Sequence, residues 1–112
     1  GFLMNVQEME TARRLDAHIV VLVWQDNGYG LIEWKQESEF GRHTDLRFGN
    51  PDFVRLAEAF GWRGFRCERS RDLAATLEEA FASDGPALVA IPIDYRENRL
   101  LTERLGRIAC PL

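Results

Sequence analysis

The residues of this chain that are best suited to chemistry form one short cluster, Asp26-Asn27-Gly28-Tyr29-Gly30. A divalent cation such as Mg²⁺ takes oxygen ligands, usually one or two carboxylates or carbonyls together with phosphate oxygens of a bound molecule. Asp26 offers a carboxylate and the loop offers carbonyl groups. Because Gly28 and Gly30 carry no Cβ, the backbone can approach a phosphate closely, and free N–H groups in such a loop form a concavity that binds anions.

The same cluster is also a frequent turn sequence. Asp, Asn and Gly all tolerate left-handed backbone angles, so they commonly connect a strand to the next element. A helix that begins near Leu31 would add its positive N-terminal end to a ligand site. The residues alone leave two interpretations open: a turn that ends a buried strand, and a loop that binds a phosphate through a metal ion.

An uninterrupted apolar run, residues 18–24, leads into the cluster. Its β-branched core, Ile-Val-Val-Leu-Val, does not alternate with polar residues, which predicts a strand covered on both faces, as in parallel sheets. We expect this strand to be the central one. In an open α/β sheet, ligands bind beyond the carboxyl ends of the strands, and Asp26 follows such an end.

The spacing of apolar residues and the residues that cap or end helices predict the remaining elements. A helix is expected over residues 4–16. A second one is expected over 51–60, with Asn50 as capping residue, Pro51 at its first position, Asp52 as an acid in its first turn and Gly61 after its end. Short strands are expected over 64–68 and 87–93. Between these strands we expect a helix that Ser70 caps and whose buried face comprises Leu73, Leu77, Ala80 and Phe81.

The resulting order is helix, strand, helix, helix, strand, helix, strand and tail. This alternation predicts an α/β fold, a partial doubly wound parallel sheet with helices on both faces and right-handed crossovers. The length of 112 residues is that of one domain.

Composition and charge exclude several classes of protein. Hydrophobic residues make up 46% of the chain, which indicates a globular domain with a core. The net charge of −4, with Arg and Glu interleaved, argues against nucleic acid as a partner. No apolar run approaches the roughly 20 residues of a membrane span, so we expect a cytoplasmic protein. Cys67 and Cys110 lack metal-ligand spacing, and we expect reduced thiols.

Other polar residues are weaker candidates. We expect structural or surface roles for His18 and His43, because no other ligand-type residue stands at metal-binding spacing from either. Glu8 and Glu10 are two positions apart and point to different sides of a helix, which favours a solvated face over an acid/base pair. The polar loop over residues 36–45 is either a cover of an active site or a plain surface connection.

Longer stretches of the sequence resemble a known family. Four such stretches follow one another over nearly the whole chain: GFLMNVQEMETARRL, WQDNGYGLIEWKQ, FGNPDFVRLAEAFGWRGFR and DGPALVAIPIDYRENRLL. They are similar to the C-terminal diphosphate-binding domain of thiamine-diphosphate enzymes, and among these to the acetolactate synthases, in particular the catabolic type.

The resemblance implies roles for individual residues. Asp26 matches a side-chain ligand of Mg²⁺, and Gly28 matches the residue whose backbone carbonyl binds the same ion. Positions that line the diphosphate, mostly through backbone groups, are matched by Gly1, Asn27, Tyr29 and Gly30. Leu31 falls near the thiazolium ring and the substrate. Trp34 stands one position before the place, here Lys35, at which anabolic relatives have a channel-lining Trp.

The resemblance also implies that part of the site lies outside these residues. The family's signature begins with Gly-Asp-Gly, whose Asp is another metal ligand, and the match would place it immediately before Gly1. The Glu that activates the cofactor belongs to another domain, across a subunit interface. We therefore expect a fragment of a homo-oligomeric enzyme that has no catalytic residue of its own. Alone, it should neither turn over pyruvate nor bind thiamine diphosphate tightly.

For the whole enzyme, the resemblance implies condensation of two pyruvates to 2-acetolactate with loss of CO₂. One alternative is another thiamine-dependent 2-oxo acid decarboxylase or oxidase, because diphosphate and Mg²⁺ contacts do not select the acceptor substrate. A second alternative is a non-catalytic α/β module. Catabolic relatives do not use FAD, and the FAD site of other relatives lies in a different domain, so the sequence leaves FAD dependence open.

Overall fold

The computed structural model describes residues 1–95, which fall into two compact units. We call residues 1–25 and 49–92 the sheet unit, and residues 26–48 and 93–95 the turn unit. The C-terminal segment 96–112, which includes Cys110 and most of the expected tail, lies outside the described residues. Among the described residues, no helix has the length and apolar character that a membrane span requires.

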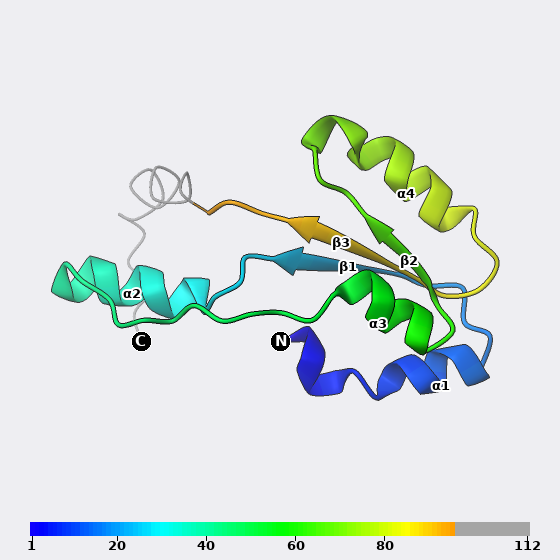
Figure 1. Ribbon diagram of the computed structural model, residues 1–112, viewed down its shortest axis with the longest axis horizontal. Coiled ribbons are helices and arrows are strands. Elements are labelled where there is room, and N and C mark those ends of the chain that lie inside the picture. The colour runs from blue at the N-terminus through cyan, green and yellow to red at the C-terminus, as the bar shows by residue number, and fades with distance from the viewer. Residues whose placement is uncertain (96–112) are drawn as a thin grey trace, which may run out of the picture. The chain divides into compact units, whose positions relative to one another are not determined.

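The sheet unit is built on three parallel strands within the described part of the chain (Figure 1). They are β1 (Val20–Gln25), β2 (Arg63–Arg66) and β3 (Ala87–Pro92), and their order is β1-β3-β2. The register pairs Val20 with Ala87 on one side of β3, and Arg63 with the same Ala87 on the other.

The expectation that the strand before the cluster is central is therefore wrong. β3 holds the central position, and Ala87 to Ile91 are all buried, because this strand has a neighbour on each side. In β1 only Val23 is fully buried, whereas 56% of Trp24 is exposed. Both strands are apolar runs without alternation, a pattern that predicts burial on both faces. The prediction is confirmed for β3 and wrong for β1, which lies at the edge of the described sheet.

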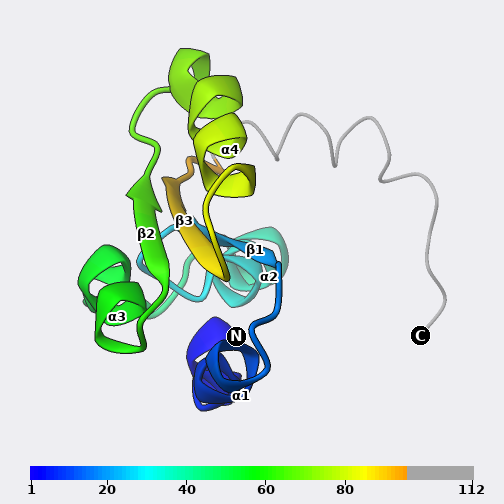
Figure 2. The ribbon, with the colours of Figure 1, turned by 90° about the vertical axis from the view of Figure 1, so that its right-hand side faces the viewer.

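Helices cover both faces of the sheet, as expected (Figure 2). Alternate residues of a strand point to opposite faces. Leu88 and Ala90 of β3 pack in one cluster with side chains of α1 (Glu8–Arg14) and α3 (Phe53–Ala59). The intervening residues of β3 therefore face the opposite side, where α4 (Leu73–Phe81) contacts β2 and β3. The fold is an α/β fold with a small parallel sheet between two helical layers.

The helices α3, α4 and α1 begin at other residues than the sequence predicts. The N-cap of α3 is Asp52 and not Asn50, and its carboxylate accepts hydrogen bonds from the amides of Val54 and Arg55 at 3.0 and 3.2 Å. An N-cap carboxylate has this reach because the second and third amides of a helix lack partners within it. The hydrogen bond from the Arg55 amide is the largest cause that lowers the pKa of Asp52, although desolvation opposes it.

Ser70 is not the cap of α4. It begins a 3-10 turn, η2 (Ser70–Asp72), and the helix starts after Asp72. Phe81 was expected on the buried face of α4 but is 70% exposed, because it is the last residue of the helix and lies past Ala80, which is buried. The expected first helix over residues 4–16 is divided into a 3-10 turn, η1 (Phe2–Asn5), and α1.

Close packing joins α3 to the sheet and α1 to the core. A Cβ on Gly64 of β2 would lie 2.8 Å from the carbonyl oxygen of Val54, so only glycine fits there. The indole Nε1 of Trp62 donates a hydrogen bond of 2.8 Å to the carbonyl of Met9, and both residues are buried. Cys67 is a free, buried thiol, as expected.

The turn unit consists of the residues after β1, α2 (Gly30–Phe40), a return segment over residues 41–48, and residues 93–95. α2 ends at Gly41, which has a left-handed φ of 64°. The expected polar loop over 36–45 is therefore wrong in its first half, since residues 36–40 are the last turns of this helix. None of the residues of α2 is buried.

Candidate functional site

The turn after β1 has a defined geometry that begins with two polar residues. Asn27 has a φ of 55°, the left-handed region that Asn adopts more easily than most residues. This conformation brings the Asp26 carboxylate next to the backbone two residues further on, where its Oδ1 accepts a hydrogen bond of 3.3 Å from the amide of Gly28. The side chain thus closes the turn by bonding its own backbone, as Asp commonly does in such turns.

A short antiparallel bridge between Gly28 and Arg47 fixes the middle of the turn. The amide of Tyr29 donates to the carbonyl of Leu46 at 3.2 Å, and the amide of Phe48 donates to the carbonyl of Asn27 at 3.1 Å. These bonds flank the bridged pair. Gly28 is thus in a non-hydrogen-bonded position, and its own N–H and C=O face away from the return segment.

The Gly28 carbonyl and the Asp26 carboxylate therefore lie on the same side of the turn. The Gly28 amide, which faces that side, already meets Asp26 Oδ1. Within residues 1–95, no backbone or side-chain donor is recorded for the Gly28 carbonyl. A carboxylate oxygen and a carbonyl oxygen are thus available together, as hard cations require.

Gly30, the first residue of α2, leaves room for the second carboxylate oxygen. A Cβ at this position would lie 2.8 Å from Asp26 Oδ2, so a side chain here would displace the carboxylate. The carboxylate therefore sits over the first turn of the helix, where unpaired amides give a partial positive charge.

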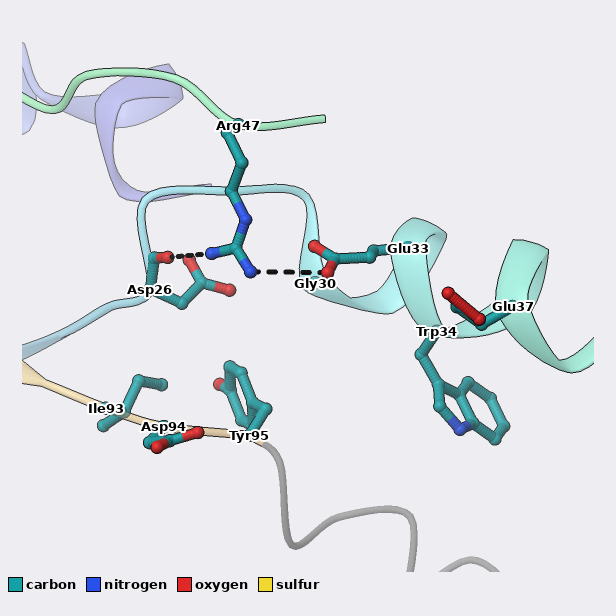
Figure 3. A pocket seen from close by; sticks show the side chains of 9 residues that line it. All are labelled: Asp26, Gly30, Glu33, Trp34, Glu37, Arg47, Ile93, Asp94 and Tyr95. Atoms are coloured by element: carbon teal, nitrogen blue, oxygen red, sulfur yellow. Dashed lines mark hydrogen bonds and ion pairs between the residues drawn. The ribbon is translucent and has the colours of Figure 1, made fainter. Parts of the chain in front are cut away.

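Asp26 and Gly30 also line a pocket of about 500 Å³ within the turn unit (Figure 3). Its wall contains four carboxylates and two aromatic rings beside a single guanidinium; the residues are Asp26, Gly30, Glu33, Trp34, Glu37, Arg47, Ile93, Asp94 and Tyr95. The sequence did not single out Glu33, Glu37 and Arg47. Asp94 and Tyr95, which follow β3, also lie in the pocket wall.

The return segment is bound to α2 through Gln36 and Glu33. The side-chain oxygen of Gln36 accepts hydrogen bonds from the amide and the hydroxyl of Thr44 at 3.0 and 3.3 Å. Arg47 Nη1 donates to the backbone carbonyl of Asp26 at 3.0 Å, and Nη2 donates to Glu33 Oε1 at 3.3 Å. His43 Nε2 lies 3.8 Å from carboxylate oxygens of both Glu33 and Glu37. His43 thus has surface ion-pair partners, which agrees with the structural or surface role expected for it.

Six of the seven predicted site residues are consecutive, Asp26 to Leu31, and the turn gathers the first five around Gly28. The ring of Tyr29 packs against Phe48 with centroids 4.9 Å apart. Leu31 is 68% exposed and touches no core. Gly1 belongs to the sheet unit, and its role stays a prediction.

The available donors suit Mg²⁺ in one particular way. In the described part of the chain, no three His, Cys, Asp or Glu side chains are grouped so that they could hold a metal ion. The turn itself presents the Asp26 carboxylate and the Gly28 carbonyl. Mg²⁺ commonly binds through one or two carboxylates and completes its octahedron with substrate phosphates and water, so these donors fit part of such a site.

The fold and the turn together define a parallel α/β domain of the kind that binds ligands beyond the carboxyl ends of its strands. A family model described as "Thiamine pyrophosphate enzyme, C-terminal TPP binding domain" matches residues 1–91. The chain belongs to this family.

Curated relatives are similar over almost the whole chain. The chain is 46% identical over 105 residues to "Acetolactate synthase, catabolic" of Raoultella terrigena. The aligned region covers 94% of this chain and 19% of that protein. It is 40% identical over 108 residues to acetolactate synthase of Bacillus subtilis (strain 168), covering 96% of this chain and 19% of that protein. The chain thus spans about a fifth of the length of these relatives.

A solved structure supports the fold. The thiamine diphosphate-dependent 4-hydroxybenzoylformate decarboxylase of Rhodococcus jostii RHA1 superposes with a TM-score of 0.75 over 86% of this chain and 18% of that one, at 23% sequence identity. At this level of identity the likeness shows a shared fold and carries no statement about the reaction.

Proposed function

We propose that this chain is the diphosphate- and Mg²⁺-binding portion of a thiamine-diphosphate-dependent acetolactate synthase, which condenses two pyruvates to 2-acetolactate and releases CO₂. The observation that carries the proposal is the 46% identity to a catabolic acetolactate synthase over 94% of the chain. That relative and the one from Bacillus subtilis are both named for this reaction product.

In this proposal the turn after β1 holds the cofactor through its charged end. The Asp26 carboxylate and the Gly28 carbonyl bind Mg²⁺, and the metal ion binds the diphosphate. Their placement on the same side of the turn supports this assignment. Backbone groups of Asn27, Tyr29 and Gly30, with Gly1, line the diphosphate, and the exposed Leu31 lies near the thiazolium ring and the substrate.

Thiamine diphosphate, when bound, supplies the carbanion stabilisation that removal of CO₂ from a 2-oxo acid requires. The residues of this chain bind and orient it, and none of them is assigned proton transfer. A further carboxylate ligand, from a Gly-Asp-Gly sequence before Gly1, and the other domains of a homo-oligomeric, cytoplasmic enzyme complete the site. We expect that FAD is not needed.

Product analysis tests the reaction. The intact protein that carries this chain is incubated with pyruvate, Mg²⁺ and thiamine diphosphate, and the products are separated and quantified. We expect 2-acetolactate and CO₂ in a ratio of about one to one, because each condensation releases one CO₂. Acetaldehyde or acetyl phosphate as the main product would instead identify a decarboxylase or an oxidase. The absence of any turnover and of cofactor binding would favour a non-catalytic module.

A further inference from the structure

The return segment is fastened to the turn at the residue that presents the candidate carbonyl ligand. Two backbone hydrogen bonds, from Tyr29 to Leu46 and from Phe48 to Asn27, enclose the Gly28–Arg47 bridge. Two hydrogen bonds are a weak attachment for a segment without buried side chains, because each replaces a hydrogen bond to water and so adds little net stability. The orientation of Gly28 therefore depends on whatever else holds residues 46–48 in place.

The ring contact between Tyr29 and Phe48 supplies part of that attachment. The side chain of Arg47 supplies a further part (Figure 3). Its guanidinium reaches the Asp26 carbonyl at 3.0 Å and Glu33 Oε1 at 3.3 Å, so it joins the turn to α2. Its aliphatic part lies over Gly28, where a Cβ would be 3.3 Å from Arg47 Cδ. One side chain thus contacts both proposed ligand residues of the metal ion without using their ligand atoms.

The charges of this arrangement are compatible with a cation beside it. An unpaired guanidinium near Mg²⁺ would repel the metal ion. Here the guanidinium is paired with the Glu33 carboxylate, whose side chain is only 23% exposed and which also lies 3.8 Å from His43. The pair therefore fixes the turn while adding little net charge to the site.

We propose that Arg47 is a positioning residue of the metal site: by bridging the Asp26 carbonyl to Glu33, it holds Asp26 and Gly28 in the conformation that binds Mg²⁺. This inference rests on the proposed function for its metal, and the bridge itself stands on the contacts of Arg47. Lysine cannot replace it, since a single ammonium does not present two donors in a fixed planar fork.

The test compares Arg47→Gln with Arg42→Gln in the intact protein. Arg42 is an exposed arginine of the same segment and forms no hydrogen bond or ion pair with any of residues 1–95, so it controls for the lost charge. Without ligand, the Tyr29 and Phe48 amides should exchange hydrogen about threefold to fivefold faster in Arg47→Gln, the effect of one exposed charged contact. The Mg²⁺ concentration for half-maximal activity should rise by about the same factor, with kcat at saturating Mg²⁺ unchanged.

Two further variants sharpen the test. Glu33→Gln should reproduce the faster exchange and should raise the Mg²⁺ requirement at least as much as Arg47→Gln, because it also removes the carboxylate that pairs with the guanidinium. The double variant should be no worse than Glu33→Gln, because the two residues act as one bridge. Arg47→Lys should recover less than half of the amide protection and of the apparent Mg²⁺ affinity that Arg47→Gln loses. Unchanged amide exchange in Arg47→Gln would overturn the bridge. Faster exchange with unchanged Mg²⁺ dependence would overturn the positioning role. A wild-type protein that binds no Mg²⁺ or thiamine diphosphate would overturn the proposed function, and the exchange result would still decide whether the bridge exists.

Discussion

The sheet unit and the turn unit are held together by different interactions. All of the buried hydrophobic side chains recorded for residues 1–95 belong to the sheet unit, with Ala57, Ala87, Leu88, Val89 and Ala90 at 0% exposure. In the turn unit, no described residue is buried. Its conformation depends on a backbone bridge, an Asp side chain that bonds its own turn, and the charged contacts of Arg47 and Glu33.

This difference explains where ligand chemistry can be placed. A buried strand has no free backbone groups, because its amides and carbonyls are used in the sheet. A turn with few partners leaves a carbonyl and a carboxylate available, but it is easily deformed because little apolar burial holds it. Substitutions in the sheet unit should therefore mainly lower folding stability, and substitutions in the turn unit should mainly lower ligand affinity.

The largest effect is expected in the sheet unit. Leu88→Ala removes one of the largest fully buried side chains from the central strand, and it should lower the free energy of unfolding by about 2–5 kcal/mol, the cost of a cavity of this kind. Urea unfolding followed by circular dichroism measures it. The matched control is Leu31→Ala in the turn unit, whose side chain is 68% exposed and which should change stability by less than about 0.5 kcal/mol. Equal losses for both variants would contradict the contrast between the units.

The next effect concerns the candidate ligand itself. Asp26→Ala should weaken Mg²⁺-dependent thiamine diphosphate binding by at least about tenfold in the intact protein, because a carboxylate ligand is lost. Asp26→Asn keeps an oxygen donor and an acceptor for the Gly28 amide, so its loss should be clearly smaller. Calorimetry measures both. Glu39→Gln, an exposed acid on α2, should bind like wild type. Asp26→Ala with unchanged affinity would rule out the metal role.

A smaller effect is expected from Gly30→Ala. The new Cβ would lie 2.8 Å from Asp26 Oδ2, the mobile end of a side chain, so the carboxylate should rotate away while the fold is retained. We expect Mg²⁺ affinity to fall about threefold, less than for loss of the ligand, with stability changed by no more than about 0.5 kcal/mol. Gly49→Ala, where nothing lies within 4 Å, is the control. A larger loss of stability than of affinity would contradict the expected division.

The smallest effect concerns the cap of α3 in the sheet unit. The pKa of Asp52 lies below its ordinary value of 3.8, chiefly because the Arg55 amide donates to the charged carboxylate. Since the folded pKa is the lower one, the stabilisation is complete above the unfolded pKa and is lost as pH falls through the folded pKa. Wild type should therefore lose slightly more stability than Asp52→Asn on acidification below about pH 4. Parallel profiles of wild type and Asp52→Asn would contradict the prediction.

Several elements could be predicted from local sequence. Apolar runs without alternation indicated the strands β1 and β3, and periodic apolar residues indicated α3, because these patterns reflect which side chains must leave water. Burial on both faces holds for β3 and not for β1. The order of helices and strands followed, and it is confirmed. The cap of α3 was misplaced by two residues, since Asn50 and Asp52 are both good capping residues and only the backbone conformation at Asp52, with a ψ of 104°, selects one.

Some features of the candidate site likewise follow from local sequence, and others depend on the tertiary structure. The sequence by itself determined that Asp26 to Gly30 form a turn after a strand and that their oxygens and open backbone suit a metal-bound phosphate, because these properties belong to the residue types and to their neighbours along the chain. Only the tertiary structure decided that β3 is central, that Glu33, Glu37 and Arg47 line the pocket, and that Arg47 meets the Asp26 carbonyl 21 residues away. Strand order and contacts between distant residues depend on how the whole chain packs, and no local pattern of side chains specifies them.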